Sequence, residues 1–283
     1  MVHRPAEGTL KFAVILLLAV MIPAQIVGFL AGTDAAMAVG IAAGFTMAVT
    51  PFATTKQALG SAVLAAALAA AASLADDTAW AVAALMLVSA VLLGLTNQHS
   101  AGLMTLAPAI VIIFGPSALD MSPAASFGYV LLGGILGWIV IRAFKFQAEA
   151  NPVPQGVAWR HAIVLGVLSA VAVYWALANN VSHGYWVAVT LVVALRPLPE
   201  QRAHTLRDRL LGTLVGALLS FVVIVWAPVW LALIVAAICL VLLATYSMGG
   251  RDFMQTLFLT PMLLIFATIG DEQQGITYTS ERV

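Results

Sequence analysis

The sequence is poor in charge. Charged residues make up only 8% of the 283 positions, whereas 63% are hydrophobic and the mean hydropathy is +1.05. A soluble protein of this size needs far more charged side chains to cover its surface. The composition therefore excludes an ordinary soluble globule and predicts an integral membrane protein.

Other absences narrow the function. The 12 basic residues are balanced by 12 acidic ones, which gives no case for nucleic-acid binding. Cys239 is the single cysteine and lies in an apolar run, so a disulfide within the chain and a thiolate metal site are excluded. We expect a buried structural thiol at this position.

Catalytic constellations are also missing. No spacing places two of the five histidines on one helical face, and the pair Asp76-Asp77 has no matching acidic motif elsewhere. Neither a nucleophile elbow nor a phosphate-binding loop occurs in the chain. The sequence therefore predicts no enzyme, no cofactor and no metal.

Apolar segments, by contrast, fill the chain. Most are long enough to cross the hydrocarbon core of a bilayer. Residues 103–114 form a shorter segment with Pro108 in its middle, which needs a kink or a protein lining. We predict an all-α polytopic protein with apolar helices at residues 12–31, 35–49, 58–74, 80–95, 103–114, 124–141, 161–177, 185–195, 210–226, 229–246 and 253–269.

Landmarks in the two halves recur at an offset of about 150 residues, which indicates an internal repeat. Six segments separate the copies, an even number, so the copies run in parallel. We expect a first six-helix repeat at 1–145, a Pro- and Gly-containing linker at 146–158, and a second repeat at 159–283. The second repeat lacks its last helix, as in a truncated chain or an eleven-span variant. The matched landmarks are Lys11 with Arg160, Pro51 with Pro197, Gly60 with Gly212, Trp80 with Trp230, and Pro108 with Pro261.

The distribution of charge predicts the orientation. If the N-terminus is cytoplasmic, every Lys and Arg except Arg282 falls on a cytoplasmic end. Asp34, Asp76, Asp77 and Asp120 then lie in the opposite loops. We therefore predict a multi-pass protein with a cytoplasmic N-terminus.

A basic stretch joins the apolar segments that end at Leu195 and begin at Leu210, and we interpret it as a hairpin. It either marks topology and contacts anionic lipid headgroups, or it concentrates organic anions at a cytoplasmic vestibule. Tyr185 and Trp186, just before it, either lie in the membrane interface or stack on an aromatic substrate. The candidate anion-binding cations are Arg196, Arg202, Arg207 and Arg209 of this stretch, with Lys11 and Arg160 at the starts of their segments.

Small residues and prolines suggest how the helices meet. Glycines spaced four apart predict close helix packing rather than a pore lining: Gly40 and Gly44, Gly133 and Gly137, and Gly212 and Gly216. Prolines at equivalent places in both copies predict helix breaks, which either expose backbone groups to a substrate path or are merely structural: Pro51, Pro108, Pro197 and Pro261. His99, beside Asn97 and Gln98, is a candidate for proton coupling.

The stretch GYWVAVTLVVALRPLPEQRAHTLRDRLLGTLVGALL resembles the fusaric-acid-resistance-like membrane family, relatives of bacterial aromatic acid exporters and, more remotely, of plant malate channels. Tyr185-Trp186 precedes an apolar segment and a basic hairpin, and Arg209, Gly212, Thr213 and Gly216 fit its R-x-x-G-T-hydrophobic-x-G helix start. The first copy departs from this pattern, with Thr50 in place of the arginine. The resemblance implies export of small organic, aromatic carboxylates.

Taken together, these features predict a transporter in the inner membrane of a bacterium, for which the Ala-rich composition is suitable. The predicted spans contain no acidic residue, which weakens proton antiport and leaves a passive anion channel as an alternative. A scaffold whose basic hairpin docks a partner or anionic lipid is a second alternative. The expected partners are a small organic anion, membrane lipids and, in a homo-oligomer, further copies of the chain, but no nucleic acid.

Overall fold

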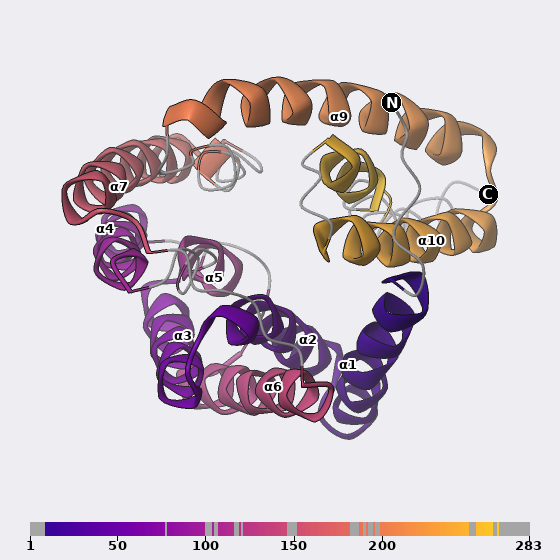
Figure 1. Cartoon of the computed structure of the whole chain (residues 1–283), viewed down its shortest axis with the longest axis horizontal. Coiled ribbons are helices and arrows are strands. Elements are labelled where there is room, and N and C mark those ends of the chain that lie inside the picture. The colour runs from indigo at the N-terminus through magenta and orange to yellow at the C-terminus, as the bar shows by residue number, and fades with distance from the viewer. Residues whose placement is uncertain are drawn as a thin grey trace, which may run out of the picture. The chain divides into compact units, whose positions relative to one another are not determined.

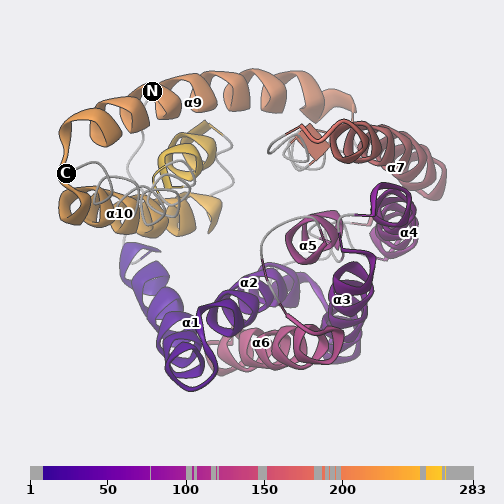
Figure 2. The same ribbon diagram turned by 180° about the vertical axis from the view of Figure 1, so that it is seen from behind.

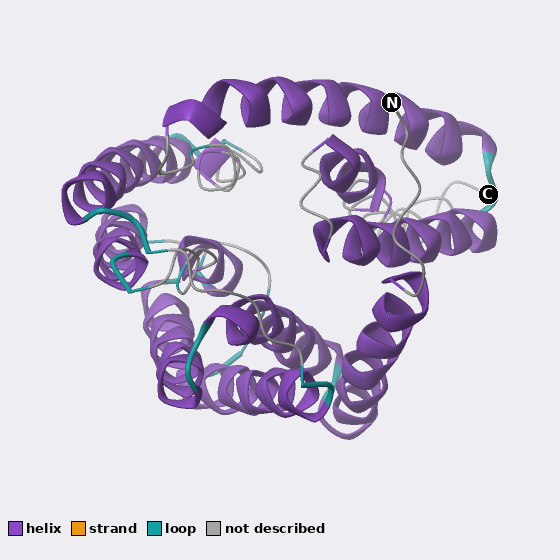
Figure 3. Ribbon diagram, viewed as in Figure 1, coloured by secondary structure: helices purple, strands orange, loops and turns teal. Residues whose placement is uncertain are grey.

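A computed structural model describes residues 9–76, 78–99, 104, 107–115, 119, 121–145, 152–181, 187–188, 191, 195, 199–248, 253–262 and 265. Within these ranges the regular structure is helical (Figure 3). Seven of the described helices are long and apolar enough to cross a membrane. The prediction of an all-α polytopic membrane protein is therefore confirmed.

The helices of the first half follow the predicted segments closely. Each begins or ends within a few residues of its predicted bounds: α1 (Thr9–Ala31), α2 (Thr33–Val49), α3 (Thr55–Ala75), α4 (Ala79–Asn97) and α6 (Pro123–Ala143). Only Gly32 separates α1 from α2, and its φ of 97° is a conformation that glycine adopts without strain. A 3-10 turn at Thr50–Phe52 interrupts the chain after α2, where Pro51 had suggested a break.

Side-chain hydrogen bonds cap the starts of α3 and α6, which apolar patterning does not predict. Before α3, Thr54 and Gln57 form a capping box. The Gln57 backbone nitrogen donates to Thr54 Oγ1 at 3.3 Å, and the Thr54 backbone nitrogen donates to Gln57 Oε1 at 2.9 Å. Similarly, Ser122 Oγ accepts from the Ala125 amide nitrogen at 3.3 Å before α6. α7 (Gln155–Ala178) begins directly after Pro154, several residues before the predicted start.

The short apolar segment is a buried helix. α5 (Ala107–Phe114) has 8 residues, and most of its side chains are buried against α3 and α4. It is thus protein-lined, which is one of the two solutions that its length allows. Pro108 lies in its first turn rather than in the middle of a helix, and there its missing N–H breaks no helical hydrogen bond.

The chain divides into two compact units, one spanning Ala19–Pro199 and one combining Met1–Leu18 with Glu200–Val283. In the 19–199 unit, α6 packs against α2 and α3, and α4 packs against α7 (Figures 1 and 2). The core of this unit is rich in alanine, which lets the helices approach closely. Ala188, one of the few described residues of the predicted span 185–195, is buried in that core.

The 200–283 unit contains α9 (Pro199–Trp226), α10 (Val229–Met248) and helical residues 253–262. Arg196 lies outside the described residues, but the prediction of a hairpin is wrong for residues 199–209 of the basic stretch, because they form the start of α9, a continuous helix of 28 residues. Two signals for its start are present in the sequence: a proline at the first helical position, and Glu200 in the first turn, where an acidic side chain favours the helix dipole.

α9 is also longer than a bilayer needs. Its length is about 42 Å, against about 30 Å for the hydrocarbon core. The portion that satisfies a membrane span is Arg207–Trp226. The first turns of α9, which carry Arg202, therefore extend beyond the apolar layer.

Candidate functional site

Two side-chain hydrogen bonds show which helix ends meet in the 19–199 unit. Arg142 Nη2, at the end of α6, donates to the Ala53 carbonyl oxygen at 3.2 Å, just after the turn between α2 and α3. At the other end of the same helices, Ser73 Oγ and Ser126 Oγ are hydrogen bonded at 2.7 Å. α3 and α6 are therefore antiparallel: the end of α6 lies beside the start of α3, and the start of α6 lies beside the end of α3.

The charges separate between these two ends. Lys56, Arg142 and Lys145 lie at the end that the Arg142 hydrogen bond defines, whereas Asp34 and Asp76 lie at the opposite end. A backbone hydrogen bond of 3.0 Å from the Val153 nitrogen to the Asn97 oxygen joins the start of α7 to the end of α4, which adds exposed Arg160 to the basic end. The described cations of this unit therefore gather at one end of its helices, opposite to Asp34 and Asp76.

In the other unit, the cations lie on α9. Arg207 is exposed and Arg209 is half-buried at the start of the apolar part of the helix. Arg202 lies one to two turns earlier on the same helix, where only its backbone is described. Lys11, in α1, is likewise described by its backbone alone. Arg196, Pro197, Tyr185 and Trp186 lie outside the described residues.

Two glycine pairs lie at close helix contacts. A Cβ atom at Gly133 or Gly137 of α6 would clash with the backbone oxygens of Val39 and Ala43 in α2. A Cβ at Gly212 would lie 2.8 Å from the Phe253 oxygen, and one at Gly216 would lie 2.9 Å from the Leu257 oxygen. Pro261 is part of this second contact, in which its Cδ approaches Gly216. Both pairs thus serve as packing positions.

The third glycine pair is different. The nearest atom to a Cβ at Gly40 is the Ala24 Cβ at 4.0 Å, which is an ordinary contact. For Gly44, no described atom lies within 4 Å of such a Cβ. Spacing alone therefore does not distinguish a tight helix contact from an open one.

Comparison with known protein families gives a match over part of the chain. The family model described as fusaric acid resistance protein-like matches residues 167–283. The second half carries this family's pattern. The match includes the whole of α9 with Arg209, Gly212 and Gly216, so the resemblance seen in the sequence is confirmed there. Searches among curated proteins and among solved structures found no match.

The apolar helices identify a multi-pass membrane protein, and the family match covers its second half. Among the residues that the structure describes, no three His, Cys, Asp or Glu side chains gather as metal ligands would. The described charged groups at the basic end of the 19–199 unit are guanidinium and ammonium groups, which bind anions reversibly.

Sequence reasoning missed a role for His161, just before the fusaric acid resistance protein-like region. This side chain is 6% exposed, and its Nε2 lies 2.9 Å from the Leu195 carbonyl oxygen. Because a carbonyl oxygen only accepts hydrogen bonds, this contact requires the tautomer with a proton on Nε2. His161 thus donates to the chain shortly before α9. No pattern in the sequence indicated that these two residues meet.

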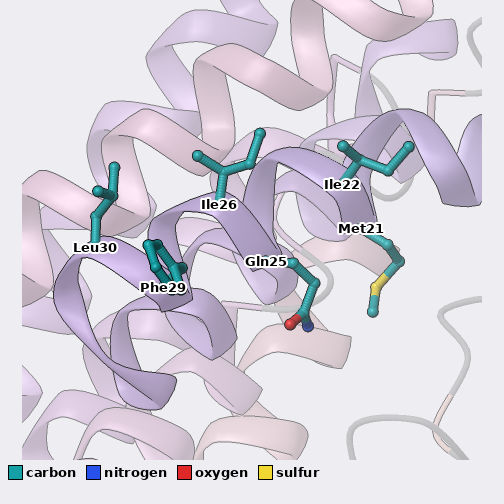
Figure 4. Close-up of a pocket in the computed structure, with 6 residues that line it drawn as sticks. All are labelled: Met21, Ile22, Gln25, Ile26, Phe29 and Leu30. Atoms are coloured by element: carbon teal, nitrogen blue, oxygen red, sulfur yellow. The ribbon is translucent and has the colours of Figure 1, made fainter.

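A shallow surface hollow on α1 has an apolar lining. It lies on one side of α1 and is lined by five apolar side chains and Gln25 (Figure 4). None of the candidate anion-binding cations lines it. Phe29, at 92% exposed, and Leu30, at 77%, show that this side of the helix faces outward, as a lipid-facing surface would. The remaining lining residues are Met21, Ile22 and Ile26.

Proposed function

We propose that this protein exports small organic anions, aromatic carboxylates in particular, across the inner membrane of a bacterium, with its N-terminus in the cytoplasm. The observation that carries the proposal is the fusaric acid resistance protein-like match over residues 167–283, which contains the cationic start of α9. The separation of charge in the 19–199 unit supports a basic cytoplasmic end, by the rule that cytoplasmic ends are rich in Lys and Arg.

Capture of the anion begins at the basic residues. Arg196, Arg202, Arg207 and Arg209, with Lys11 and Arg160, raise the local concentration of anions at the cytoplasmic face. An arginine can then bind a carboxylate through two parallel hydrogen bonds, which a lysine cannot do with the same geometry. Tyr185 and Trp186 add a surface on which an aromatic ring stacks.

The test is transport by the purified full-length protein in proteoliposomes, with 4-hydroxybenzoate and malate as substrates. We expect counterflow that saturates and prefers the aromatic acid. Arg196→Ala and Arg209→Ala should each lower the apparent affinity by about tenfold, the effect of losing about 1.4 kcal/mol of binding.

Two other outcomes would overturn the proposal. A current that rises without saturation at fixed voltage would identify a passive anion channel. Complete absence of flux, with the protein verified as folded, would favour the scaffold whose basic residues dock a partner or anionic lipid.

A further inference from the structure

Among the buried polar atoms that have no hydrogen-bond partner in the described part of the chain, three belong to the packed helices α2 and α6: Thr46 Oγ1 of α2, and Trp138 Nε1 and Arg142 Nε of α6. Buried polar groups in folded proteins are nearly always paired, and an unpaired charged donor is the most costly of them. Three such atoms between the same helices therefore call for a common explanation.

The three atoms follow one stripe along α6. Positions 134, 138 and 142 are four residues apart, so they lie on the same face of the helix. A Cβ at Gly134 would lie 3.3 Å from Thr46 Oγ1, which places the threonine hydroxyl at the inner end of this stripe. Eight residues of helix span about 12 Å. The stripe thus leads from the end of α6 to the middle of its span.

Arg142 is held in place at the outer end. Its Nη2 donates to the Ala53 oxygen, and this bond leaves the buried Nε–H as a fixed donor. The contact lies beside the 3-10 turn at Thr50–Phe52, where the first copy has Thr50 at the place of Arg196 in the second. α6 therefore places the Arg142 guanidinium beside this turn, which has no arginine at the position that matches Arg196 in the predicted second repeat.

The described carboxylates next to these helices lie at the end opposite to this guanidinium. Asp34 is in the first turn of α2 and Asp76 follows α3, while Asp120 and Glu149 lie outside the described residues. A positive group with a buried donor and no acidic neighbour among the described residues is suited to a carboxylate from outside the protein.

We propose that Arg142, Trp138 and Thr46 form a carboxylate-binding site in the first half of the protein. Arg142 Nε–H binds the carboxylate of a small organic acid at the basic end, Trp138 Nε1–H offers a second donor one turn further in, and Thr46 Oγ1 a third polar group at mid-span. The site rests on the proposed function, because it would be the point at which the transported anion enters the helix bundle.

The experiment compares two variants that each remove one positive charge at the same helix end. Arg142→Gln removes the half-buried guanidinium with its buried Nε–H, whereas Lys145→Gln removes an exposed ammonium three residues later. Each purified full-length protein is tested for counterflow of 4-hydroxybenzoate and, separately, for the rise in unfolding temperature that millimolar 4-hydroxybenzoate produces.

We expect Arg142→Gln to raise KM about tenfold and to abolish the thermal shift, with Lys145→Gln within about twofold of the wild type. Trp138→Phe should raise KM by less. If Arg142→Gln does not fold, Arg142→Lys decides: it keeps the charge without the Nε donor, and a raised KM supports the site.

Equal effects of Arg142→Gln and Lys145→Gln in a transporting protein would overturn the site and leave the proposed function intact. A thermal shift that depends on Arg142 without any flux would support the site and overturn the proposed function. Neither flux nor a shift in the wild type would overturn both.

Discussion

At the scale of single residues, the described side chains show how polar groups are satisfied in an apolar chain. His161 donates to the Leu195 carbonyl oxygen. In a membrane, such an oxygen has no water to replace the donor, so the histidine stabilises the contact between α7 and Leu195. The contact uses the ring N–H as a hydrogen-bond donor.

His161→Leu should therefore destabilise the protein by about 1–3 kcal/mol, because it removes the donor to a part-buried carbonyl oxygen. His161→Gln should cost less, since its amide nitrogen can still donate. The measurement is the midpoint of thermal unfolding of each variant in detergent. Equal midpoints for the two variants would show that the hydrogen bond is not what stabilises this contact.

Thr54 provides a second residue-scale prediction. Thr54→Ala removes the hydroxyl that accepts from the Gln57 backbone nitrogen and should destabilise the start of α3 by about 1 kcal/mol. Thr55→Ala, the matched control, changes an exposed neighbour in the first turn of α3. Denaturant titration of both variants is the test, and a loss of stability as large in Thr55→Ala would argue against the cap.

At the scale of helices, glycines set how closely α2 and α6 approach. Gly137→Ala should destabilise the protein by about 1–3 kcal/mol, because its Cβ would meet the Ala43 backbone oxygen, which cannot move aside cheaply. Gly44→Ala, in the facing helix α2, should be neutral or stabilising by up to about 1 kcal/mol, since a Cβ there meets open space and alanine is the better helix former.

Thermal unfolding in detergent of Gly137→Ala and Gly44→Ala decides this prediction. The two changes add the same single methyl group to neighbouring helices, so general effects of the substitution cancel. Equal midpoints would mean that the α2–α6 contact adjusts more freely than its backbone distances imply.

Apolar patterning predicted the long helices within a few residues, because burial in lipid demands long uninterrupted apolar runs. It failed where other interactions set the boundary. The first turns of α9 are charged and were interpreted as a hairpin, although Pro199 and Glu200 favour a helix start. Arg142 was counted only as a topology signal, since nothing in a single sequence shows that it reaches Ala53.

At the scale of the whole molecule, the division into two parallel repeats stays a prediction, and two contacts within the units support it. α3 packs against α5 in the 19–199 unit, and α9 packs against helical residues 253–262 in the 200–283 unit. These pairs are counterparts at the offset of about 150 residues that relates the sequence landmarks. Equivalent helices thus pair in both halves, as an inherited duplication would require.

The orientation of the molecule follows from its charge and can be measured directly. Replacing Cys239, which is buried, with alanine gives a chain without cysteine. Thr33→Cys and Thr55→Cys then place one thiol at each end of the 19–199 unit, both at exposed positions and both by the same substitution. With a cytoplasmic N-terminus, Thr33 is outside and Thr55 inside.

A membrane-impermeant maleimide should therefore label the Thr33→Cys protein in intact cells and the Thr55→Cys protein only after permeabilisation. The opposite pattern would place Lys56, Arg142 and Arg160 outside the cell, where they could not capture an anion for export. In that case the charge separation would instead suit uptake, because the cations would face the external medium. Labelling of both proteins in intact cells would indicate that the chain inserts in two orientations, as a protein with weakly biased charges can.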